Sequence, residues 1–285
     1  MNTASILHVT GDQVAARVRA LPPLPQVWHA LDDALRSDTA SPDRIVRLVS
    51  SDPGLTAVTL KLANSPFYGV SGRVVGLRDA VQILGLQTLS AATLTAAVIA
   101  RFDPAACPAF DMTGSWRHAL GTAACAQLLA EPRGIDPGAA YTAGLLHDIG
   151  TLALATSFPD VFNETLAWAA RHDVPPLDAE RELLGLDHAV VGGMVARHWR
   201  LAPAIADAMR QHHEAPDGPS ASLGDVLHLS DNIVHALDVS HAADDLVPPL
   251  DIGAWARVAP TSDELCRVFE QVEARLDRFD FGTFR

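Results

Sequence analysis

A histidine and an aspartate stand side by side at positions 147 and 148, inside the otherwise apolar string LLHDIG that covers residues 145–150. Imidazole nitrogens and carboxylate oxygens together suit borderline transition ions such as iron, manganese or zinc. Neighbouring residues on a helix point about 100° apart, so His147 and Asp148 cannot share one helix face. The pair therefore predicts a metal site only if other helices supply the remaining ligands.

Further His and Asp residues along the chain could supply those ligands. The most informative is Asp231, because it lies on a helical stripe with Leu227 and Val234 that we expect to face the core. A lone carboxylate in a core is costly unless it is paired, hydrogen-bonded or bound to a cation. The candidate ligands for one or two ions of Fe, Mn or Zn are His118, His147, Asp148, His188, His212, His213 and Asp231.

The same residues also allow a purely structural interpretation. A buried histidine is often a hydrogen-bonded core residue, and His212 and His213 would favourably end a helix, where positive charge is stabilised. The residue pattern by itself leaves both interpretations open. The remaining histidines are expected at the surface: His8, His29, His172, His198, His228, His235 and His241.

The elements that must position these residues are helices, because apolar residues recur with helical spacing from end to end and no segment alternates like a strand. In the first part of the chain we expect four helices. The first covers 24–36, the second begins after the cap and first-turn pair Ser41-Pro42, and the third runs from Asp52-Pro53 to about residue 63. The fourth covers 77–101 and has a break at Gly85. The prolines and glycines of residues 102–114 predict a boundary between two helical halves.

Beyond this boundary the expected helices cover residues 115–130, 139–156, 161–172, 178–184, 188–199, 203–213 and 222–237. Residues 238–260 are expected to be loop, and Thr261 with Glu264 predicts a capping box that opens a last helix. The prediction is an all-α, multi-helix bundle in two halves. They cover residues 1–110 and 111–240, followed by a C-terminal extension with a helix over 241–285.

Composition and charge exclude several classes of protein. The chain has 285 residues and a formal net charge of −13, which repels nucleic acids and anionic membranes. The uncharged residues 80–100 are long enough to cross a bilayer, but their Gln, Ser and Thr side chains favour two buried helices that meet at Gly85. Three separated cysteines and the lack of a signal-peptide pattern predict a cytoplasmic protein without disulfides.

The order of the candidate ligands resembles the HD superfamily of metal-dependent phosphohydrolases. That superfamily has a histidine, an HD pair, later histidines and a distal aspartate. The corresponding residues here are His118, His147-Asp148, His188, His212-His213 and Asp231. The resemblance implies that these residues bind metal.

Other segments resemble the HDOD family, which joins a helical N-terminal half to an HD-like half. They are LPPLP at 21–25, DPGL at 52–55, LANSPFYG at 62–69 and GLDHAVVG at 185–192. The similarity covers roughly residues 20–240. It implies an HDOD/HD-domain-like fold and a role in bacterial signal transduction.

The HD-GYP phosphodiesterases, which hydrolyse cyclic di-GMP, are also similar in the strings HHE at 212–214 and DG at 217–218. Two departures from that family bear on catalysis. The GYP string is absent, with SAS at 220–222 in its place, and Thr151 stands where those enzymes carry a lysine after HDIG. A lysine there would offer a cation to a phosphate, so its replacement argues against turnover.

Two functions of different classes follow. The first is a regulatory protein that binds a signalling partner or a small ligand, with any metal acting as a structural or sensory element. The second is a metal-dependent phosphodiesterase acting on cyclic di-GMP or another nucleotide. We favour the first, because Lys61 is the only lysine of this acidic chain and no arginine cluster compensates for Thr151.

Overall fold

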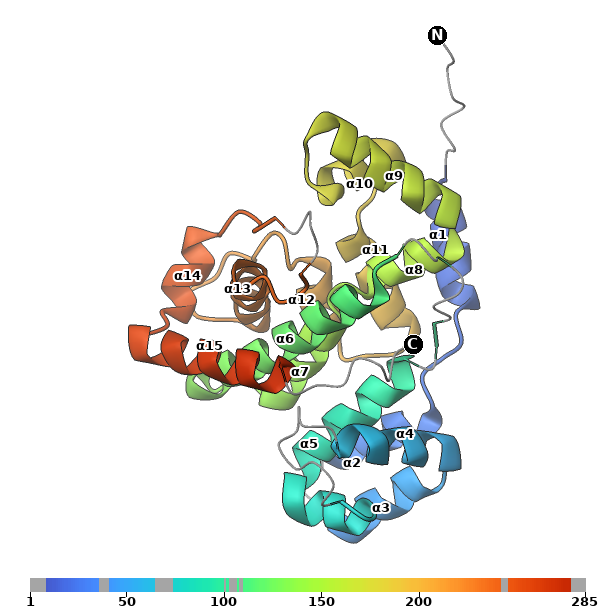
Figure 1. The fold of residues 1–285 in the computed structure, drawn as a ribbon, viewed down its shortest axis with the longest axis vertical. Helices are drawn as coiled ribbons and strands as arrows, with labels where there is room; N and C mark the ends of the chain where they lie inside the picture. Colours follow the sequence, from blue (N-terminus) through green and yellow to red (C-terminus); the bar gives the residue numbers. More distant parts are fainter. Residues whose placement is uncertain are drawn as a thin grey trace.

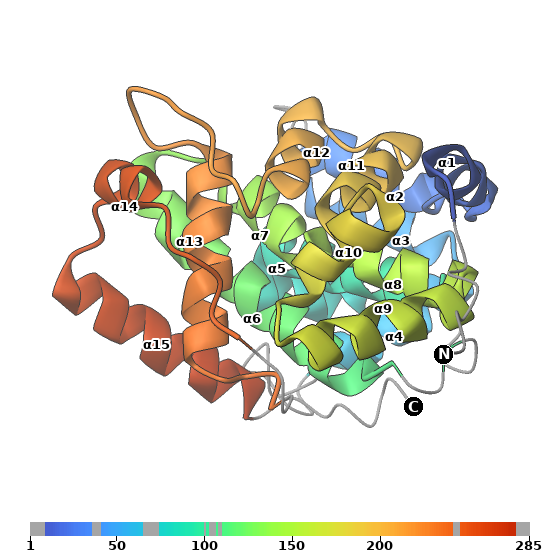
Figure 2. The same ribbon diagram turned by 90° about the horizontal axis from the view of Figure 1, so that it is seen from above.

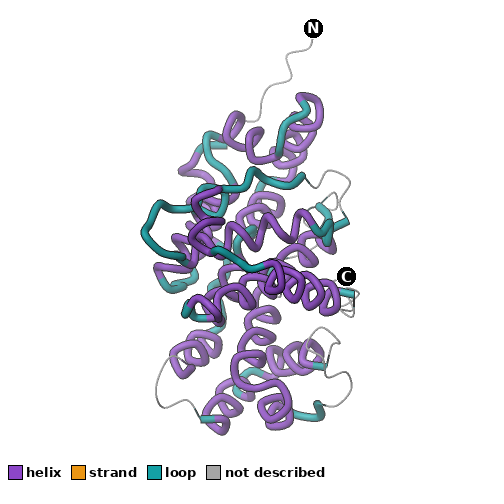
Figure 3. Tube along the Cα trace, turned by 90° about the vertical axis from the view of Figure 1, so that its left-hand side faces the viewer, coloured by secondary structure: helices purple, strands orange, loops and turns teal. Residues whose placement is uncertain are grey.

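The computed structural model describes residues 9–35, 41–64, 74–99, 101–102, 107, 110–241 and 246–277. Within these residues all regular structure is helical and no strand occurs, as the tube drawing shows (Figure 3). The prediction of an all-α fold is confirmed. His8 and most of the segment 62–69 lie outside the described residues.

One end of the molecule is formed by α2 (Gln26–Leu35), α3 (Pro42–Ser50), α4 (Pro53–Ala63) and α5 (Leu77–Ile99) (Figure 1). They follow α1 (Gly11–Ala20) in the chain. The side chain of Ser41 caps α3 as expected, and that of Asp52 caps α4; each accepts a hydrogen bond from a backbone N–H in the first turn. Helix α1 was not predicted. It packs against α8 and α11 of the second half rather than with α2–α5.

Helix α5 bends sharply at Gly85, which confirms the predicted break. Gly85 has φ 80° and ψ 169°, a conformation that residues with a Cβ rarely adopt. The two segments, Leu77–Leu86 and Thr88–Val98, diverge by 111°. Among the described residues no single helix is long and apolar enough to cross a membrane, although this bent pair would suffice by length and composition alone.

The remaining helices form the larger part of the molecule (Figure 2). They are α6 (Met112–Ala130), the short 3₁₀ helix η3 (Glu131–Arg133), α7 (Pro137–Leu146), α8 (Ile149–Ser157), α9 (Pro159–His172), α10 (Pro176–Leu184), α11 (His188–His198), α12 (Pro203–Arg210), α13 (Leu223–Ala236), α14 (Ile252–Val258) and α15 (Ser262–Leu276). Helix α6 is central, because it packs against α7, α13 and α15.

Three sequence-based boundaries were wrong. The expected helix over 139–156 is two helices, α7 and α8, separated by a turn at residues 147 and 148. The helix expected over 203–213 ends at Arg210, so His212 and His213 lie in the following turn. The expected loop over 238–260 contains α14, whose N-cap Asp251 accepts a hydrogen bond from the backbone N–H of Ala254.

The hydrophobic core has two clusters of buried residues. The smaller cluster lies within α2–α5 and includes Leu31, Ile45 and Leu89. The larger cluster runs from Val14 of α1 to Leu276 of α15. Because this core takes in residues from both predicted halves, the elements around α6, α7 and α13 are held by one continuous packing interior. The exact boundaries of the halves stay a prediction.

Candidate metal centre

His147 and Asp148 lie in the turn between α7 and α8, where the chain changes direction. Asp148 has φ −95° and ψ 12°, so the two side chains are not separated as they would be on a continuous helix. Gly150, two residues later, lets α8 approach α11 closely. A Cβ at Gly150 would collide with the backbone carbonyl of His188 and lie 2.7 Å from the nitrogen of Gly192. This close approach brings His188 opposite Asp148.

One ligand cluster forms around Asp231 of α13. His118, from the middle of α6, places its Nε2 2.9 Å from Asp231 Oδ1. His147 Nε2 lies 3.2 Å from the same oxygen and 3.1 Å from His118 Nε2. All three side chains are buried. The sequence-predicted ligands His118, His147 and Asp231 are therefore brought together.

A second cluster consists of His188, His212 and His213. His188 begins α11, and its Nε2 lies 2.8 Å from His213 Nε2. The rings of His212 and His213 have centroids 3.9 Å apart. Their nitrogens lie close enough together for one ion to contact all three. The remaining predicted histidines are thus also brought together, although they come from two separate elements.

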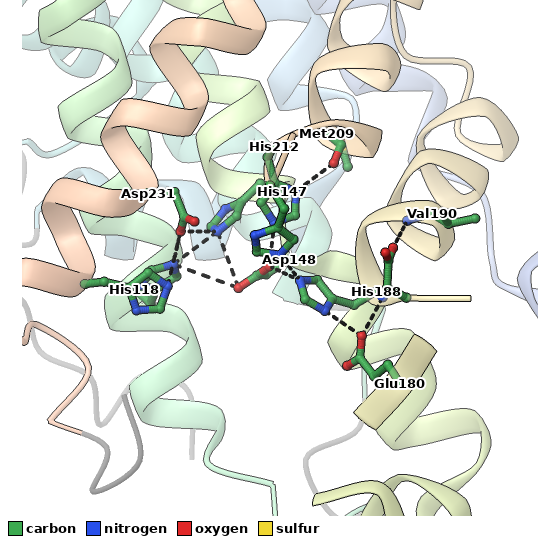
Figure 4. A network of polar contacts seen from close by, with 12 residues as sticks. His118, His147, Asp148, Glu180, His188, Val190, Met209, His212 and Asp231 are labelled. Carbon is green, nitrogen blue, oxygen red and sulfur yellow. Dashed lines mark hydrogen bonds and ion pairs between the residues drawn. The ribbon is translucent and has the colours of Figure 1, made fainter. Parts of the chain in front are cut away.

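Asp148 stands between the two clusters, with one oxygen toward each (Figure 4). Its Oδ2 lies 3.4 Å from His147 Nε2. Its Oδ1 lies 3.3 Å from His188 Nε2 and 3.5 Å from His212 Nε2. A carboxylate in this position can contact ions in both clusters. The side chain is about one third exposed (36%), so this part of the site is open to solvent.

Hydrogen bonds on the far side of three imidazoles fix their orientation. The Nδ1 atoms of His147 and His212 lie 2.8 Å and 2.7 Å from the backbone carbonyls of Gly144 and Met209. A carbonyl can only accept, so each Nδ1 carries the proton and each neutral ring keeps its Nε2 lone pair. Metal-binding histidines are held by such bonds in general. These rings are therefore oriented as ligands.

Glu180 of α10 performs the same task for His188 and was missed at the sequence level. Its Oε2 accepts hydrogen bonds from both the backbone N–H and the Nδ1 of His188, each at 2.7 Å. Glu180 is buried. It stands among charged residues on an amphipathic helix, so its pattern in the sequence is that of a surface residue.

Buried polar atoms without a hydrogen-bond partner test whether these residues fit a metal. Within the described residues, His212 Nε2, Asp231 Oδ2 and His118 Nδ1 have none. A buried polar atom without a partner costs free energy. A cation between the two clusters would lie near His212 Nε2 and the Asp231 carboxylate and could give them a partner. The donor set of imidazoles and carboxylates suits borderline transition ions. The residues therefore fit the predicted metal.

The charges of the site also favour a cation. Burial raises the pKa of the Asp148 and Asp231 carboxyls, but the surrounding imidazoles outweigh it and hold both pKa values well below 3.8. Burial lowers the pKa of His147, yet the two carboxylates hold it well above 6.5. Two ionised carboxylates in a buried cluster need positive charge, which a proton on His147 supplies when no ion does.

In the second cluster the pKa values of His188 and His213 are shifted in opposite directions. Burial lowers the pKa of His188, but the Glu180 carboxylate outweighs it and raises the pKa to about 9. Burial and the neighbouring His212 and His188 lower the pKa of His213 far below its ordinary value. His213 is therefore neutral, with a nitrogen able to bind a metal.

Among the expected surface histidines, His172 and His241 are exposed, whereas His29 and His198 are partly buried. His228 is buried, and its Nδ1 donates to the backbone carbonyl of His212 while its Nε2 accepts from the N–H of Asp251. His235 is partly buried, with its Nε2 3.4 Å from Asp231 Oδ1. The sequence prediction was wrong for His228 and His235, because packing of α13 against α6 and α14 covers faces that periodicity alone does not identify.

The fold and the site define an all-α protein with paired His/Asp clusters that could hold metal ions. Residues 21–215 match the HDOD domain family. The chain belongs to the HDOD family, as its sequence motifs indicated.

Two solved structures of similar fold have high coverage in both directions. An HDOD domain protein from Geobacter sulfurreducens is 25% identical with a TM-score of 0.74, covering 93% of this chain and 96% of that one. A candidate phosphohydrolase from Shewanella amazonensis SB2B is 26% identical with a TM-score of 0.67, covering 91% and 97%.

A curated relative from Treponema pallidum (strain Nichols), named only as an uncharacterized protein, is 26% identical over 211 residues. The match takes in 72% of this chain but 40% of the relative. The chain thus spans less than half the length of that protein.

Proposed function

We propose that this HDOD protein is a regulatory module that holds one or two transition-metal ions and acts by binding a signalling partner or a small ligand. One observation carries the metal part of the proposal. Imidazole nitrogens from both clusters point their Nε2 atoms at the two oxygens of Asp148. An ion at these distances would be contacted by imidazole nitrogens and by the shared carboxylate, and it would take the place of the protons that His147 and His188 otherwise carry.

The two ions would be held by different residues. His118, His147 and Asp231 would hold the first, and His188, His212 and His213 the second, with Asp148 contacting both. This set of five imidazoles and two carboxylates favours Fe, Mn or Zn over magnesium or calcium, which prefer oxygen ligands.

The groups around the site support binding rather than hydrolysis. Thr151 offers no cation, and its backbone N–H donates to the carbonyl of Asp148. The guanidinium of Arg181 is committed to Asp187 at 2.8 Å and to Glu214 at 3.0 Å. A phosphoryl group would therefore depend on the ions alone for positive charge, on a chain with a net charge of −13.

A second function, phosphodiester hydrolysis, is favoured by the completeness of the ligand set and by the partial exposure of Asp148. Bound ions would supply Lewis-acid stabilisation of charge on a phosphoryl group. In that case Asp148 and the histidines would hold and orient the ions, and the exposed edge of Asp148 would mark the side from which the substrate enters. The similarity to the Shewanella protein supports this alternative.

Metal content tests the proposed site directly. Protein purified without chelators is expected to contain transition metal by elemental analysis, or to take up one or two equivalents of Zn²⁺ on titration. Asp148→Ala should lose most of this metal, because both clusters share that carboxylate. The matched control is Asp207→Ala, which removes an exposed carboxylate from α12. Equal metal content in Asp148→Ala and in the wild type would show that these residues form a buried polar cluster and do not bind the metal.

An activity assay separates the two functions. Metal-loaded protein is incubated with cyclic di-GMP and with a chromogenic phosphodiester, and product is measured. We expect no turnover approaching ordinary enzyme rates of roughly one per second or more. Metal-dependent turnover at such rates, abolished in Asp148→Ala, would replace the regulatory proposal by the enzymatic one.

A further inference from the structure

His235 lies one helical turn after Asp231 on the same face of α13. Its Nε2 is 3.4 Å from Asp231 Oδ1, and its ring centroid is 4.3 Å from that of His118. The side chain is 19% exposed, so it closes the cluster from the solvent side. Neither the family pattern nor the set of seven candidate ligands includes this residue.

The packing of α13 on α6 brings His235 to this position. Gly121 of α6 faces Val234 of α13 so closely that a Cβ on the glycine would lie 3.1 Å from Val234 Cγ1. His118 is three residues before Gly121 on α6, and His235 follows Val234 on α13. The close contact at the small residue therefore sets the short distance between the two imidazole rings.

Three imidazole nitrogens crowd around one oxygen of Asp231. The Nε2 atoms of His118, His147 and His235 lie 2.9, 3.2 and 3.4 Å from Oδ1. The Nδ1 of His147 donates to the carbonyl of Gly144, which leaves its Nε2 as the ring atom that faces this oxygen. The nitrogens of His118 and His147 are also only 3.1 Å apart. A proton on each ring supplies the three contacts to Oδ1 but leaves the nitrogens of His118 and His147 facing each other, whereas a cation can be contacted by both nitrogens and by the oxygen.

The spacing of Asp231 and His235 is itself a chelating geometry. Residues at i and i+4 of a helix present their side chains on one face, one turn apart. Two ligand residues at this spacing are the basis of helical metal motifs. His118, Asp231 and His235 have ligand atoms close enough together to contact one ion.

We infer that His235 is an additional ligand of the metal ion held by His118, His147 and Asp231. The inference rests on the proposed metal centre and extends it. With His235, each cluster has three imidazoles, and Asp148 lies between them. A nitrogen-rich set of this kind selects borderline divalent ions such as Zn²⁺ or Fe²⁺ and discriminates against Mg²⁺ at both positions.

The test compares His235→Ala with the wild type and with His172→Ala. His172 is an exposed histidine on α9, a helix that supplies no candidate ligand, so His172→Ala controls for the loss of an imidazole. Zn²⁺ is titrated into metal-free protein by calorimetry, and X-ray absorption of the zinc-loaded protein counts imidazole ligands. Circular dichroism checks the fold of each variant.

We expect His235→Ala to weaken one of two zinc-binding steps by at least about tenfold and to lower the mean number of imidazoles per zinc. His172→Ala should match the wild type in both respects. His235→Gln, which keeps a polar side chain without an imidazole, should behave as His235→Ala does.

Unchanged affinity and unchanged imidazole count in folded His235→Ala and His235→Gln would overturn the inference while leaving the metal centre in place. Failure of wild-type protein to bind zinc would instead overturn the proposed metal centre, and the inference with it.

Discussion

Three of the candidate ligands, His147, His212 and His188, depend on a second residue that orients the imidazole. Gly144 and Met209 do so through backbone carbonyls, but Glu180 uses a buried carboxylate that accepts two hydrogen bonds from His188. A negative charge behind an imidazole increases its strength as a ligand. Glu180 is therefore a positioning residue whose charge matters beyond its shape.

Glu180→Gln tests this role at the residue scale. The amide keeps an oxygen that can accept from His188 but removes the charge, so we expect metal affinity to fall by about 10- to 100-fold. Calorimetric titration with Zn²⁺ measures the change. Glu182→Gln, at an exposed position of the same helix, is the control. If both variants bind zinc as the wild type does, the charge of Glu180 has no part in metal binding.

At the scale of elements, the approach of α8 to α11 decides where His188 lies. Gly150 allows it, since any side chain there would meet the backbone of His188 and Gly192. Backbone atoms cannot move aside as a flexible side chain can. The glycine of the HDIG string is thus explained by helix packing rather than by chemistry at the site.

Gly150→Ala should destabilise the protein by about 3 kcal/mol or more, because the added methyl group forces the two helices apart. Chemical denaturation measures the free energy of unfolding. Gly54→Ala is the contrasting variant, since a Cβ there is 3.5 Å from the nearest atom, Asp52 Oδ1. Its effect should lie within about 1 kcal/mol of zero. Similar values for the two variants would contradict the packing argument.

Besides its packing against α6, the C-terminal helix α15 is held by an ion pair to η3. Arg133 binds Glu264 with both terminal nitrogens, at 2.6 and 3.1 Å, and also contacts the carbonyls of Leu129 and Val258. Thr261 caps α15 by accepting from the Glu264 N–H. In the described contacts the Glu264 side chain binds Arg133 instead of the backbone N–H of Thr261. Of the two hydrogen bonds of the expected capping box, only the one accepted by Thr261 is therefore present.

This ion pair predicts a pH-dependent stability. The Arg133 guanidinium holds the pKa of Glu264 below its ordinary value of 4.5. The pair therefore stabilises the fold at pH values above about 4.5, and this contribution is lost as the pH falls through the lower pKa of the folded state. Glu264→Gln should cost about 1–3 kcal/mol near neutral pH and progressively less in acid. Denaturation curves at several pH values check this, and a constant difference would exclude the ionised pair as the cause.

At the scale of the whole molecule, the two ligand clusters join elements that are distant in the sequence. The candidate ligands come from α6, the α7–α8 turn, the start of α11, the turn after α12, and α13. An ion bound there would connect most of the larger helical core. Metal binding should therefore contribute to the stability of the whole fold.

Removing metal tests that contribution. At a free Zn²⁺ concentration about 100 times the Kd, binding adds about 2.7 kcal/mol of stability, which corresponds to a rise in Tm of roughly 4–8 °C for a chain of this size. Differential scanning calorimetry of chelated and zinc-reloaded protein measures the shift. Asp148→Ala should show no such rise, and an equal rise in that variant would place the stabilising ion elsewhere.

The sequence by itself determined most of the helices and the candidate ligands that the fold brings together. Capping residues such as Ser41, Asp52 and Ser222 fixed where helices begin, since they act on backbone N–H groups only a few residues away. Gly85 fixed the bend in α5 for an equally local reason. Asp231 was recognisable because a carboxylate on an apolar stripe needs a partner wherever that stripe is buried.

Only the tertiary structure decided how these residues meet. His118 and Asp231 are 113 residues apart in sequence and 2.9 Å apart in space, a distance set by the packing of α6 on α13. The same packing placed His235 beside Asp231 and buried His228, and the contact between α10 and α11 placed Glu180 behind His188. Periodicity identifies the face on which a residue lies, but the neighbour on that face depends on contacts between distant helices.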